Sequence, residues 1–371
     1  MSSKGSVPRL GRPVARSAFD RPHHLHPGHF VDRLRAGVST GRSGRPRRAR
    51  APGAGAATLA QASFLLATAL VAWAGAHVGA EPDPLPPFAG TTVSQDALLH
   101  ALATSRSRQF KPVGRTSVLF RMRTESRVTA GYKVKSRVME HGYRSEIATY
   151  RVGRLLLLDN VPPTIFRRAT RREIKARFHK DKLDRWSSVR RSISWEDDGT
   201  VVGAASYWIK GARRGLEDQK STWQTWLRIE GTIPPRKTKL ARDLSTMTLF
   251  DFLVGNWDRY SGGNLLMDAE GTRAFLVDND RAFSGMNEKL YERLLGDLTR
   301  TERFSKGVVD QLVVLDRNAI QQELAQDPSH RSEPLVTDAQ ITALLDRRAT
   351  ILSYITALVE EHGDKQVLFF P

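Results

Sequence analysis

Five polar residues stand among apolar or turn-forming neighbours: Lys133, Glu146, Asp258, Asn264 and Asp278. Phosphoryl transfer from a nucleotide uses this combination of side chains. A strand lysine, held by a helix glutamate, positions the phosphates, and a loop aspartate orients the acceptor hydroxyl and takes its proton. A carboxamide and a second aspartate hold the divalent metal ion. The residue types therefore predict phosphoryl-transfer chemistry that depends on ATP and on Mg²⁺ or Mn²⁺.

The elements that would carry Lys133 and Glu146 are read from the residues around them. Between Thr116 and Lys135, short runs of β-type residues alternate with polar ones, which predicts two or three antiparallel strands. Residues 145–158 are predicted to form a helix that is capped by Ser145 and stopped before Pro162. Lys133 would lie on the last strand, and Glu146 would open the helix.

The elements around Asp258, Asn264 and Asp278 follow in the second half of the chain. A helix over 244–254 is apolar on nearly every side, which indicates a buried helix. The loop 255–263 then leads to short strands over 264–268 and 273–277, and Asp278 follows the second strand. The remainder reads as helical, and the clearest helix lies between Thr337 and Gly363. The predicted class is α+β, with a small β-rich lobe followed by a larger helical lobe.

The segments that hold these residues resemble a known family. Thr246-Met247-Thr248-Leu249-Phe250-Asp251-Phe252-Leu253-Val254-Gly255-Asn256-Trp257-Asp258-Arg259 is similar to the catalytic segment of the secretory-pathway kinases, such as the Golgi casein kinase and the glycosaminoglycan xylose kinase. Leu276-Val277-Asp278-Asn279 resembles their metal-binding strand end. Ala130-Gly131-Tyr132-Lys133 and Ser145-Glu146-Ile147-Ala148-Thr149-Tyr150 match, in order, their nucleotide-lysine strand and helix. The resemblance covers roughly residues 115–360.

The resemblance implies an atypical two-lobed protein-kinase fold and a role for each of the five residues. Asp258 would be the catalytic base and Asp278 the metal ligand. Lys133 and Glu146 would position the nucleotide, and Asn264 would make a second contact to metal or phosphate. Two rivals stay open: Lys135, on the same strand face as Lys133, and Asp280, two residues after Asp278.

This chain departs from the family pattern at several positions. Tyr260 stands where many members have a histidine, and Asn264 follows Asp258 by six residues rather than five. His141 stands where casein-kinase members have a second acidic residue, with Glu140 beside it. Only Gly114 is present where ordinary kinases have a glycine-rich loop. The lack of cysteine, against disulfide-rich animal members, indicates a distant bacterial relative.

The charge of the chain is unevenly distributed. Residues 1–50 hold 12 Lys and Arg against two Asp and Glu, and so supply about half of the net charge of +19. Residues 1–57 are rich in Arg, Gly, Pro and Ser without an apolar period, which predicts a disordered leader. A nucleic-acid-binding protein is a further reading of this charge, but we expect no specific nucleic-acid partner.

An uncharged stretch follows the basic leader. Residues 58–80 include thirteen apolar or small residues, 64–76, and end in small residues before Glu81, which is the pattern of a secretory signal peptide or of a signal-anchor helix. Either one places residues 81–371 outside the cytoplasm, as a periplasmic, secreted or membrane-anchored protein. Only an uncleaved 58–80 would contact a membrane. A proline-rich linker over 81–105, an N-lobe over 106–212 and a C-lobe over 213–371 complete the expected domain order.

The sequence therefore predicts an extracytoplasmic kinase that phosphorylates a hydroxyl of a protein Ser/Thr or of a glycan. The basic run 167–191 holds 11 Lys and Arg against three Asp and Glu, which adds acidic acceptors to the candidates. The alternative is a catalytically weak pseudokinase that binds a nucleotide or a partner. The oligomeric state is left open.

Overall fold

The computed structural model describes residues 85–114 and 117–371. The leader predicted over 1–57 and the signal or anchor segment predicted over 58–80 lie outside these residues. No helix within the described part of the chain is long and apolar enough to cross a membrane.

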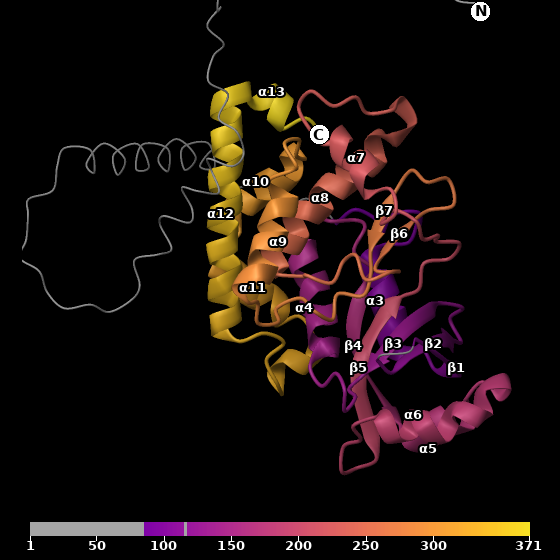
Figure 1. Ribbon diagram of the computed structural model, residues 1–371. Helices are drawn as coiled ribbons and strands as arrows, with labels where there is room; N and C mark the ends of the chain where they lie inside the picture. The colour runs from indigo at the N-terminus through magenta and orange to yellow at the C-terminus, as the bar shows by residue number, and fades with distance from the viewer. Residues whose placement is uncertain (1–84, 115–116) are drawn as a thin grey trace, which may run out of the picture. The chain divides into compact units, whose positions relative to one another are not determined.

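The first half of the described chain forms a five-stranded antiparallel sheet in the order β1-β2-β3-β5-β4 (Figure 1). Its strands are β1 (Ser107–Val113), β2 (Leu119–Thr124), β3 (Thr129–Val134), β4 (Thr164–Thr170) and β5 (Thr200–Tyr207). The antiparallel strands predicted between Thr116 and Lys135 are confirmed as β2 and β3. The sequence also predicts a strand over 205–210, which overlaps the end of β5, although β5 begins five residues earlier.

The outer strands of the sheet, β1 and β4, are absent from the sequence prediction. Both are edge strands, and their exposed positions carry polar or basic residues that break the apolar alternation. Pro112 lies in β1, which has a neighbour on one side only. Proline is confined to such positions because it has no N–H to donate to a second strand.

One face of the sheet is covered by a short helical insertion. Its elements are α5 (Arg171–Ala176), η2 (Lys180–Arg185) and α6 (Trp186–Ser192). Ile174 and Phe178 pack with Phe110, Phe120 and Tyr132 into one buried apolar cluster. Burying these side chains holds the insertion against the sheet, so the cationic side chains of the basic run 167–191 lie mainly on its outer side.

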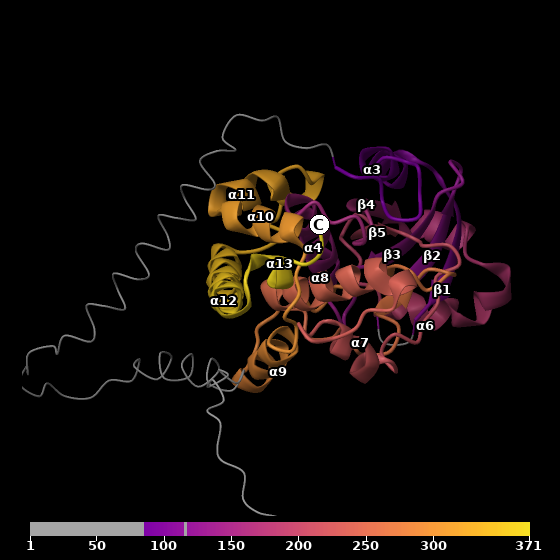
Figure 2. The same cartoon turned by 90° about the horizontal axis from the view of Figure 1, so that it is seen from above.

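Helix α3 (Gln95–Thr104) lies within the stretch predicted to be a linker over 81–105, so that prediction is wrong for its second half. The helix is capped by Ser94 and buries Leu98 and Leu102, and it packs on β4 and β5 (Figure 2). Before it, Phe88 is fully buried, with ring contacts to Tyr207 and Phe275. The proline-rich composition suggests a linker, but Phe88 within it packs into the core of the folded domain.

Helix α4 (Gly142–Leu155) follows β3 and begins three residues before the predicted start. His141 is its N-cap residue, and the predicted cap, Ser145, lies inside the first turns. Because glycine has a low helix propensity, a helix that begins at Gly142 is not expected from the sequence. A Cβ at Gly142 would lie 2.5 Å from Met139 Cγ and 3.0 Å from Asp280 Cβ, so the close approach of these residues requires glycine.

The second half of the chain is helical except for one hairpin. The hairpin strands are β6 (Leu265–Met267) and β7 (Ala274–Leu276), at the predicted positions. The helices are α7 (Lys220–Trp226), η3 (Pro235–Lys237), α8 (Thr238–Val254), α9 (Glu288–Leu298), α10 (Lys306–Val314), α11 (Arg317–Leu324), η4 (Pro328–Arg331), α12 (Asp338–His362) and α13 (Asp364–Val367). Helix α8 is buried along most of its length, as predicted, although it begins six residues earlier.

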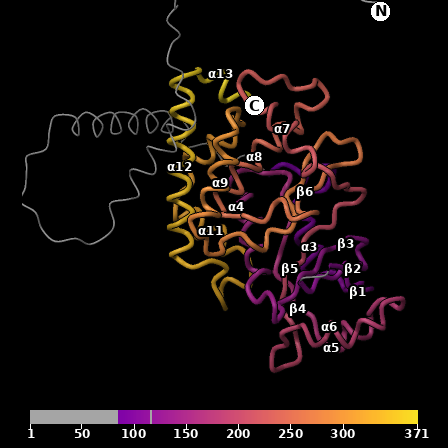
Figure 3. The backbone as a smooth tube through the Cα atoms, viewed as in Figure 1, coloured from indigo at the N-terminus to yellow at the C-terminus, as the bar shows by residue number. Residues whose placement is uncertain are grey.

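The C-terminal helix α12 has the ends that the sequence predicts. Thr337 accepts a hydrogen bond from Gln340 N and Gln340 reaches back to Thr337 N, which is a capping box, and Gly363 ends the helix. Helix α12 packs along α8, α10 and α11 (Figure 3). The α+β class and the division into a small β-rich lobe and a larger helical lobe are confirmed.

Candidate active site

Lys133 and Glu146 form a buried ion pair between β3 and α4. The Lys133 Nζ lies 2.7 Å from Glu146 Oε1. Lys133 is paired with Leu119 on β2 and with Ala204 on β5, so its backbone is held from both sides. The predicted pairing of a strand lysine with a helix glutamate is therefore present in the geometry.

Two further carboxylates approach the same ammonium group from the loop after β7. Asp278 forms an ion pair with Lys133, and Asp280 Oδ2 lies 2.8 Å from Lys133 Nζ. Burial alone would lower the pKa of Lys133, but the three carboxylates outweigh it and hold that pKa well above its ordinary value. Lys133 is therefore a permanent cation at this site.

Asp278 itself has an uncommon backbone conformation. Its φ of 56° is in the left-handed region, which non-glycine residues seldom occupy and which is enriched at functional sites. Its side chain is 39% exposed, in contrast to the buried side chains of Lys133 and Glu146. Although burial works against its ionisation, the Lys133 ammonium holds the pKa of Asp278 below its ordinary value. The carboxylate is thus ionised and accessible.

Asp258 lies in the loop after α8, whose end is set by Gly255 in the left-handed conformation. The Asp258 N–H donates to Asn256 Oδ1 at 3.3 Å, and the Asp258 carbonyl accepts from Asn264 Nδ2 at 3.0 Å. The backbone on both sides of Asp258 is therefore held by carboxamides. Its carboxylate accepts a hydrogen bond from the exposed hydroxyl of Ser261, so it lies within reach of a hydroxyl group from outside.

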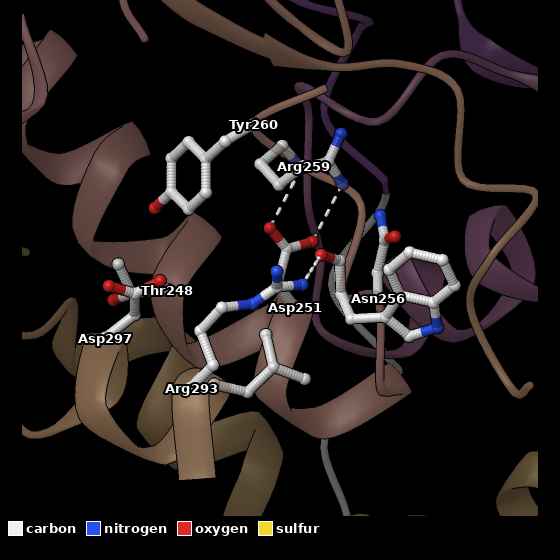
Figure 4. Close-up of a pocket in the computed structure, with 9 residues that line it drawn as sticks. Thr248, Asp251, Asn256, Arg259, Tyr260, Arg293 and Asp297 are labelled. Carbon is white, nitrogen blue, oxygen red and sulfur yellow. Dashed lines mark hydrogen bonds and ion pairs between the residues drawn. The ribbon is translucent and has the colours of Figure 1, made fainter. Parts of the chain in front are cut away.

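Arg259 joins this loop to the strand end that carries Asp278. Its guanidinium donates to both carboxylate oxygens of Asp251 on α8, at 2.9 and 2.7 Å (Figure 4). It also donates to the carbonyls of Asn264 and Val277, each at 2.7 Å, and to Asn279 Oδ1 at 2.6 Å. The side chain is fully buried, and Asp251 outweighs the burial effect to raise the pKa of Arg259. Arg259 is the hub that fixes the two loops relative to each other.

Asn279 completes the connection to α4. Its backbone N–H donates to Glu146 Oε2 at 3.0 Å, while its side chain accepts from Arg259. Glu146 therefore binds Lys133 through one oxygen and the strand end through the other. Lys133 thus contacts both Glu146 and Asp278, and Asn279, the residue after Asp278, contacts Glu146. Asp258 and Asn264 are linked to them through Arg259.

Tyr260, which stands where many family members have a histidine, lies between Lys220 and a small pocket. The Tyr260 ring is covered by Lys220, whose Nζ lies 3.7 Å from the ring centroid. Its hydroxyl points toward Thr248 and Asp297 in the small pocket beside the loop (Figure 4). Burial raises the pKa of Tyr260 well above its ordinary value, with Asp297 adding to the effect. Tyr260 is therefore a neutral phenol and cannot replace the charge of an imidazolium.

The structure shows three residues that hold the site together and that the sequence analysis gives no role: Arg259, Asp251 and Asn279. Asp251 carried a signal, because it is a lone charge in the apolar run 249–254 and such a charge needs a buried partner. The sequence offers Asp280 only as a rival of Asp278, whereas in the structure both contact Lys133. The other rival, Lys135, pairs with Glu196 at 3.2 Å instead of entering the site.

The donor set can be compared with what a divalent cation requires. No cluster of three or more His, Asp or Glu side chains is arranged as a formed metal site within residues 85–114 and 117–371. However, one ammonium faces the carboxylates of Glu146, Asp278 and Asp280, which leaves an excess of negative charge. Oxygen ligands of this kind suit Mg²⁺ or Mn²⁺. Because the Nδ2 of Asn264 is bound to a carbonyl, its oxygen is the atom available to a metal.

Comparison with known proteins finds similarity to the Golgi casein kinase family and to a xylosylkinase. Residues 218–367 match the family model described as Golgi casein kinase, C-terminal, Fam20. A curated relative, glycosaminoglycan xylosylkinase from Danio rerio, is 28% identical over 131 residues. That alignment covers 34% of this chain and 31% of the relative, so the chain matches about a third of the relative's length. The family match includes Asp258, Asn264 and Asp278, and it leaves Lys133 and Glu146 outside.

Solved structures share the fold of both lobes. The Golgi casein kinase, in one crystal structure and in a second one with Mn/ADP bound, superposes with a TM-score of 0.54 at 17% identity. The alignment covers 74% of this chain and 78% of that protein. A hydra Fam20 structure with sugar also gives 0.54, over 75% of this chain and 93% of that protein. The family match and the shared two-lobed fold confirm the resemblance to the secretory-pathway atypical kinases.

Proposed function

We propose that the chain is a kinase that transfers the γ-phosphoryl group of ATP to a hydroxyl of a protein or glycan acceptor. The observation that carries the proposal is the position of Lys133, bound to Glu146 from the β-rich lobe and to Asp278 from the helical lobe. In kinases this lysine, its glutamate and the metal-binding aspartate must be in place together.

Lys133 would position the phosphates, with Glu146 holding its ammonium. Asp278 and the oxygen of Asn264 would hold Mg²⁺ or Mn²⁺, and Asp280 adds a carboxylate beside them. The metal ion would neutralise charge on the transferred group. To hold phosphates and a metal ion, Lys133 and the two aspartates would have to give up the ion pairs that they form with each other. The accessible Asp278 carboxylate permits this change, while buried Glu146 keeps hold of Lys133.

Asp258 would act on the acceptor. Its carboxylate now accepts the hydroxyl of Ser261, and an acceptor hydroxyl could occupy the same position. The carboxamides of Asn256 and Asn264 hold the Asp258 backbone, so the carboxylate can be aimed without large rearrangement. As the base, Asp258 would orient the hydroxyl toward the γ-phosphorus and take its proton.

The acceptor and the location belong to the same proposal. One relative is named for glycosaminoglycan xylose and another for casein, so both glycan and protein hydroxyls are candidates. Acidic acceptors would suit the basic insertion over 167–191. A place outside the cytoplasm follows from the predicted signal or anchor at 58–80. A reporter fused after residue 100 should be active only outside the cytoplasm, and activity inside it would refute the location.

A pseudokinase that binds nucleotide without turnover is the second candidate. It is favoured by Tyr260, a neutral phenol where many members have a histidine. The set Lys133, Glu146, Asp258 and Asp278 favours the active enzyme, because a binding module has no chemical need for Asp258.

Labelled ATP separates the two candidates. The chain should be incubated with Mg²⁺ or Mn²⁺ and with casein or a xylose-containing glycan, and label on protein, on glycan and in free phosphate should be followed. Transfer that is lost in Asp258→Asn supports the enzyme. Nucleotide binding without transfer or hydrolysis, in wild type and variant alike, supports the pseudokinase.

A further inference from the structure

The helix that carries Glu146 is held from the side opposite the sheet. Helix α4 packs between the strands β4 and β5 and helix α11 of the C-lobe (Figure 1). One to two turns after Glu146, three polar side chains of α4 face neighbouring elements: Tyr150, Arg151 and Arg154. Tyr150 and Arg151 are buried.

Arg151 is the centre of a charge cluster with the C-lobe. Its Nη1 donates to Glu323 Oε1, on α11, at 3.1 Å. Its Nη2 lies 3.9 Å from Asp327 Oδ2, in the turn before η4. Arg151 is 4% exposed and Asp327 is 0% exposed. Buried charges of this kind are retained only with partners, because removing one partner leaves the other uncompensated.

The two acidic residues also tie the cluster to its surroundings. Glu323 Oε1 lies 2.9 Å from Arg154 Nε, so one carboxylate meets two arginines of α4. Asp327 Oδ2 accepts the backbone N–H of Phe166 on β4 at 3.2 Å, and its Oδ1 accepts from Ser329. Segment 323–329 of the C-lobe is thus bound to both α4 and the N-lobe sheet.

A further link between α4 and the C-lobe lies nearer the start of the helix, where the Asn279 backbone N–H donates to Glu146 Oε2 at 3.0 Å. In protein kinases the position of this helix is commonly set by the activation loop. Here only residues 279–287 separate Asp278 from α9. Another contact, between Arg144 and Glu333, reaches the first turn of α4, but the Glu333 side chain is 51% exposed, and exposed ion pairs contribute little.

We propose that Arg151, Glu323 and Asp327 form a clamp that holds α4 in place, with Glu146 beside Lys133. They are positioning residues, since none touches the nucleotide site. The consequence is a helix held in its binding-competent position by the fold itself. This inference rests on the proposed function for its effect on nucleotide binding, but the clamp can be measured without it.

The test uses Glu323→Gln in the full chain, with hydrogen exchange of residues 142–155 as the first readout. The substitution keeps the shape and removes one charge. We expect faster exchange in α4, because exchange reports local opening. We also expect affinity for Mg²⁺–ADP to fall about three- to tenfold, in proportion to the lost competent fraction. The kcat at saturating ATP should stay near wild type.

Two further variants keep the test decisive. Asp310→Asn breaks an exposed ion pair with Lys306 on α10 and should leave exchange in α4 unchanged. Arg154→Gln removes one partner of Glu323 and should raise the exchange by a smaller factor. If exchange in 142–155 matches wild type in Glu323→Gln, the clamp is refuted. If wild type binds no nucleotide, the proposed function fails, while the exchange comparison still decides the clamp.

Discussion

Arg259 and Asp251 form a buried ion pair with two hydrogen bonds, and Arg259 directly follows the proposed base, Asp258. The same guanidinium binds the carbonyls of Asn264 and Val277. One side chain therefore couples the loop that would meet the acceptor to the strand end that would hold the metal. The catalytic arrangement depends on a residue that has no expected contact with substrate.

Replacement of Asp251 should destabilise the protein strongly. Asp251→Asn leaves the buried Arg259 charge without its counter-ion, which costs about 3–5 kcal/mol of unfolding free energy. Urea unfolding measures the loss. The control Asp310→Asn, in an exposed pair, should cost less than about 1 kcal/mol. Equal, small losses in both variants would mean that the Asp251–Arg259 pair is dispensable.

The segment before α3 should contribute measurably to stability. Phe88 is fully buried, with Tyr207 and Phe275 around its ring. Phe88→Ala should therefore lower the unfolding free energy by about 3–5 kcal/mol. Val93, five residues on, is 44% exposed, and Val93→Ala should change it by about 0.5 kcal/mol or less. A Phe88→Ala effect as small as the Val93→Ala effect would show that this segment is only a linker.

Asp268, in the turn of the β6–β7 hairpin, should make a pH-dependent contribution to the free energy of unfolding. Asp268 accepts hydrogen bonds from Thr272 N and Oγ and from Arg273 N. Burial alone would raise the pKa of Asp268, but these bonds hold it below its ordinary value. A carboxyl with a lowered folded-state pKa stabilises the fold above its unfolded pKa of about 3.9, and this stabilisation is lost as the pH falls through the folded value.

Asp268→Asn tests this contribution. At pH 7 the variant should be less stable than wild type by about 1 kcal/mol, and the difference should shrink at pH 3 as the wild-type carboxyl is protonated. Denaturant unfolding at the two pH values is the measurement. A difference that stays the same at both would show that the charge of Asp268 is not the source.

Much of the site could be predicted from the sequence because its residues lie in local patterns. Asp278 follows an apolar strand, Asp258 follows a buried helix, and Lys133 lies on an alternating strand. These neighbours position a side chain through local structure alone. Their assembly into one site was inferred from the family resemblance, and the Lys133–Glu146 and Lys133–Asp278 contacts agree with it.

Other features could not be read in this way. Lys133 also contacts Asp280, two residues after Asp278, whose backbone is left-handed. The clamp on Arg151 joins residues more than 170 positions apart. The edge strand β4 and helix α3 have weak local patterns, since half of each element faces solvent or polar neighbours. Such features are set by tertiary packing, which overrides local propensity.

The most direct test of the central claim compares two variants by binding and by turnover. Calorimetry should measure the binding of ADP in the presence of Mg²⁺ or Mn²⁺, and labelled ATP should be used to measure phosphoryl transfer. Both measurements are made on wild type, Asp278→Ala and Asp258→Asn. The account predicts that Asp278→Ala loses metal-dependent nucleotide binding. It predicts that Asp258→Asn keeps this binding and loses turnover by a factor of about 10² or more. Near-normal turnover in Asp258→Asn, or unchanged metal-dependent binding in Asp278→Ala, would contradict it.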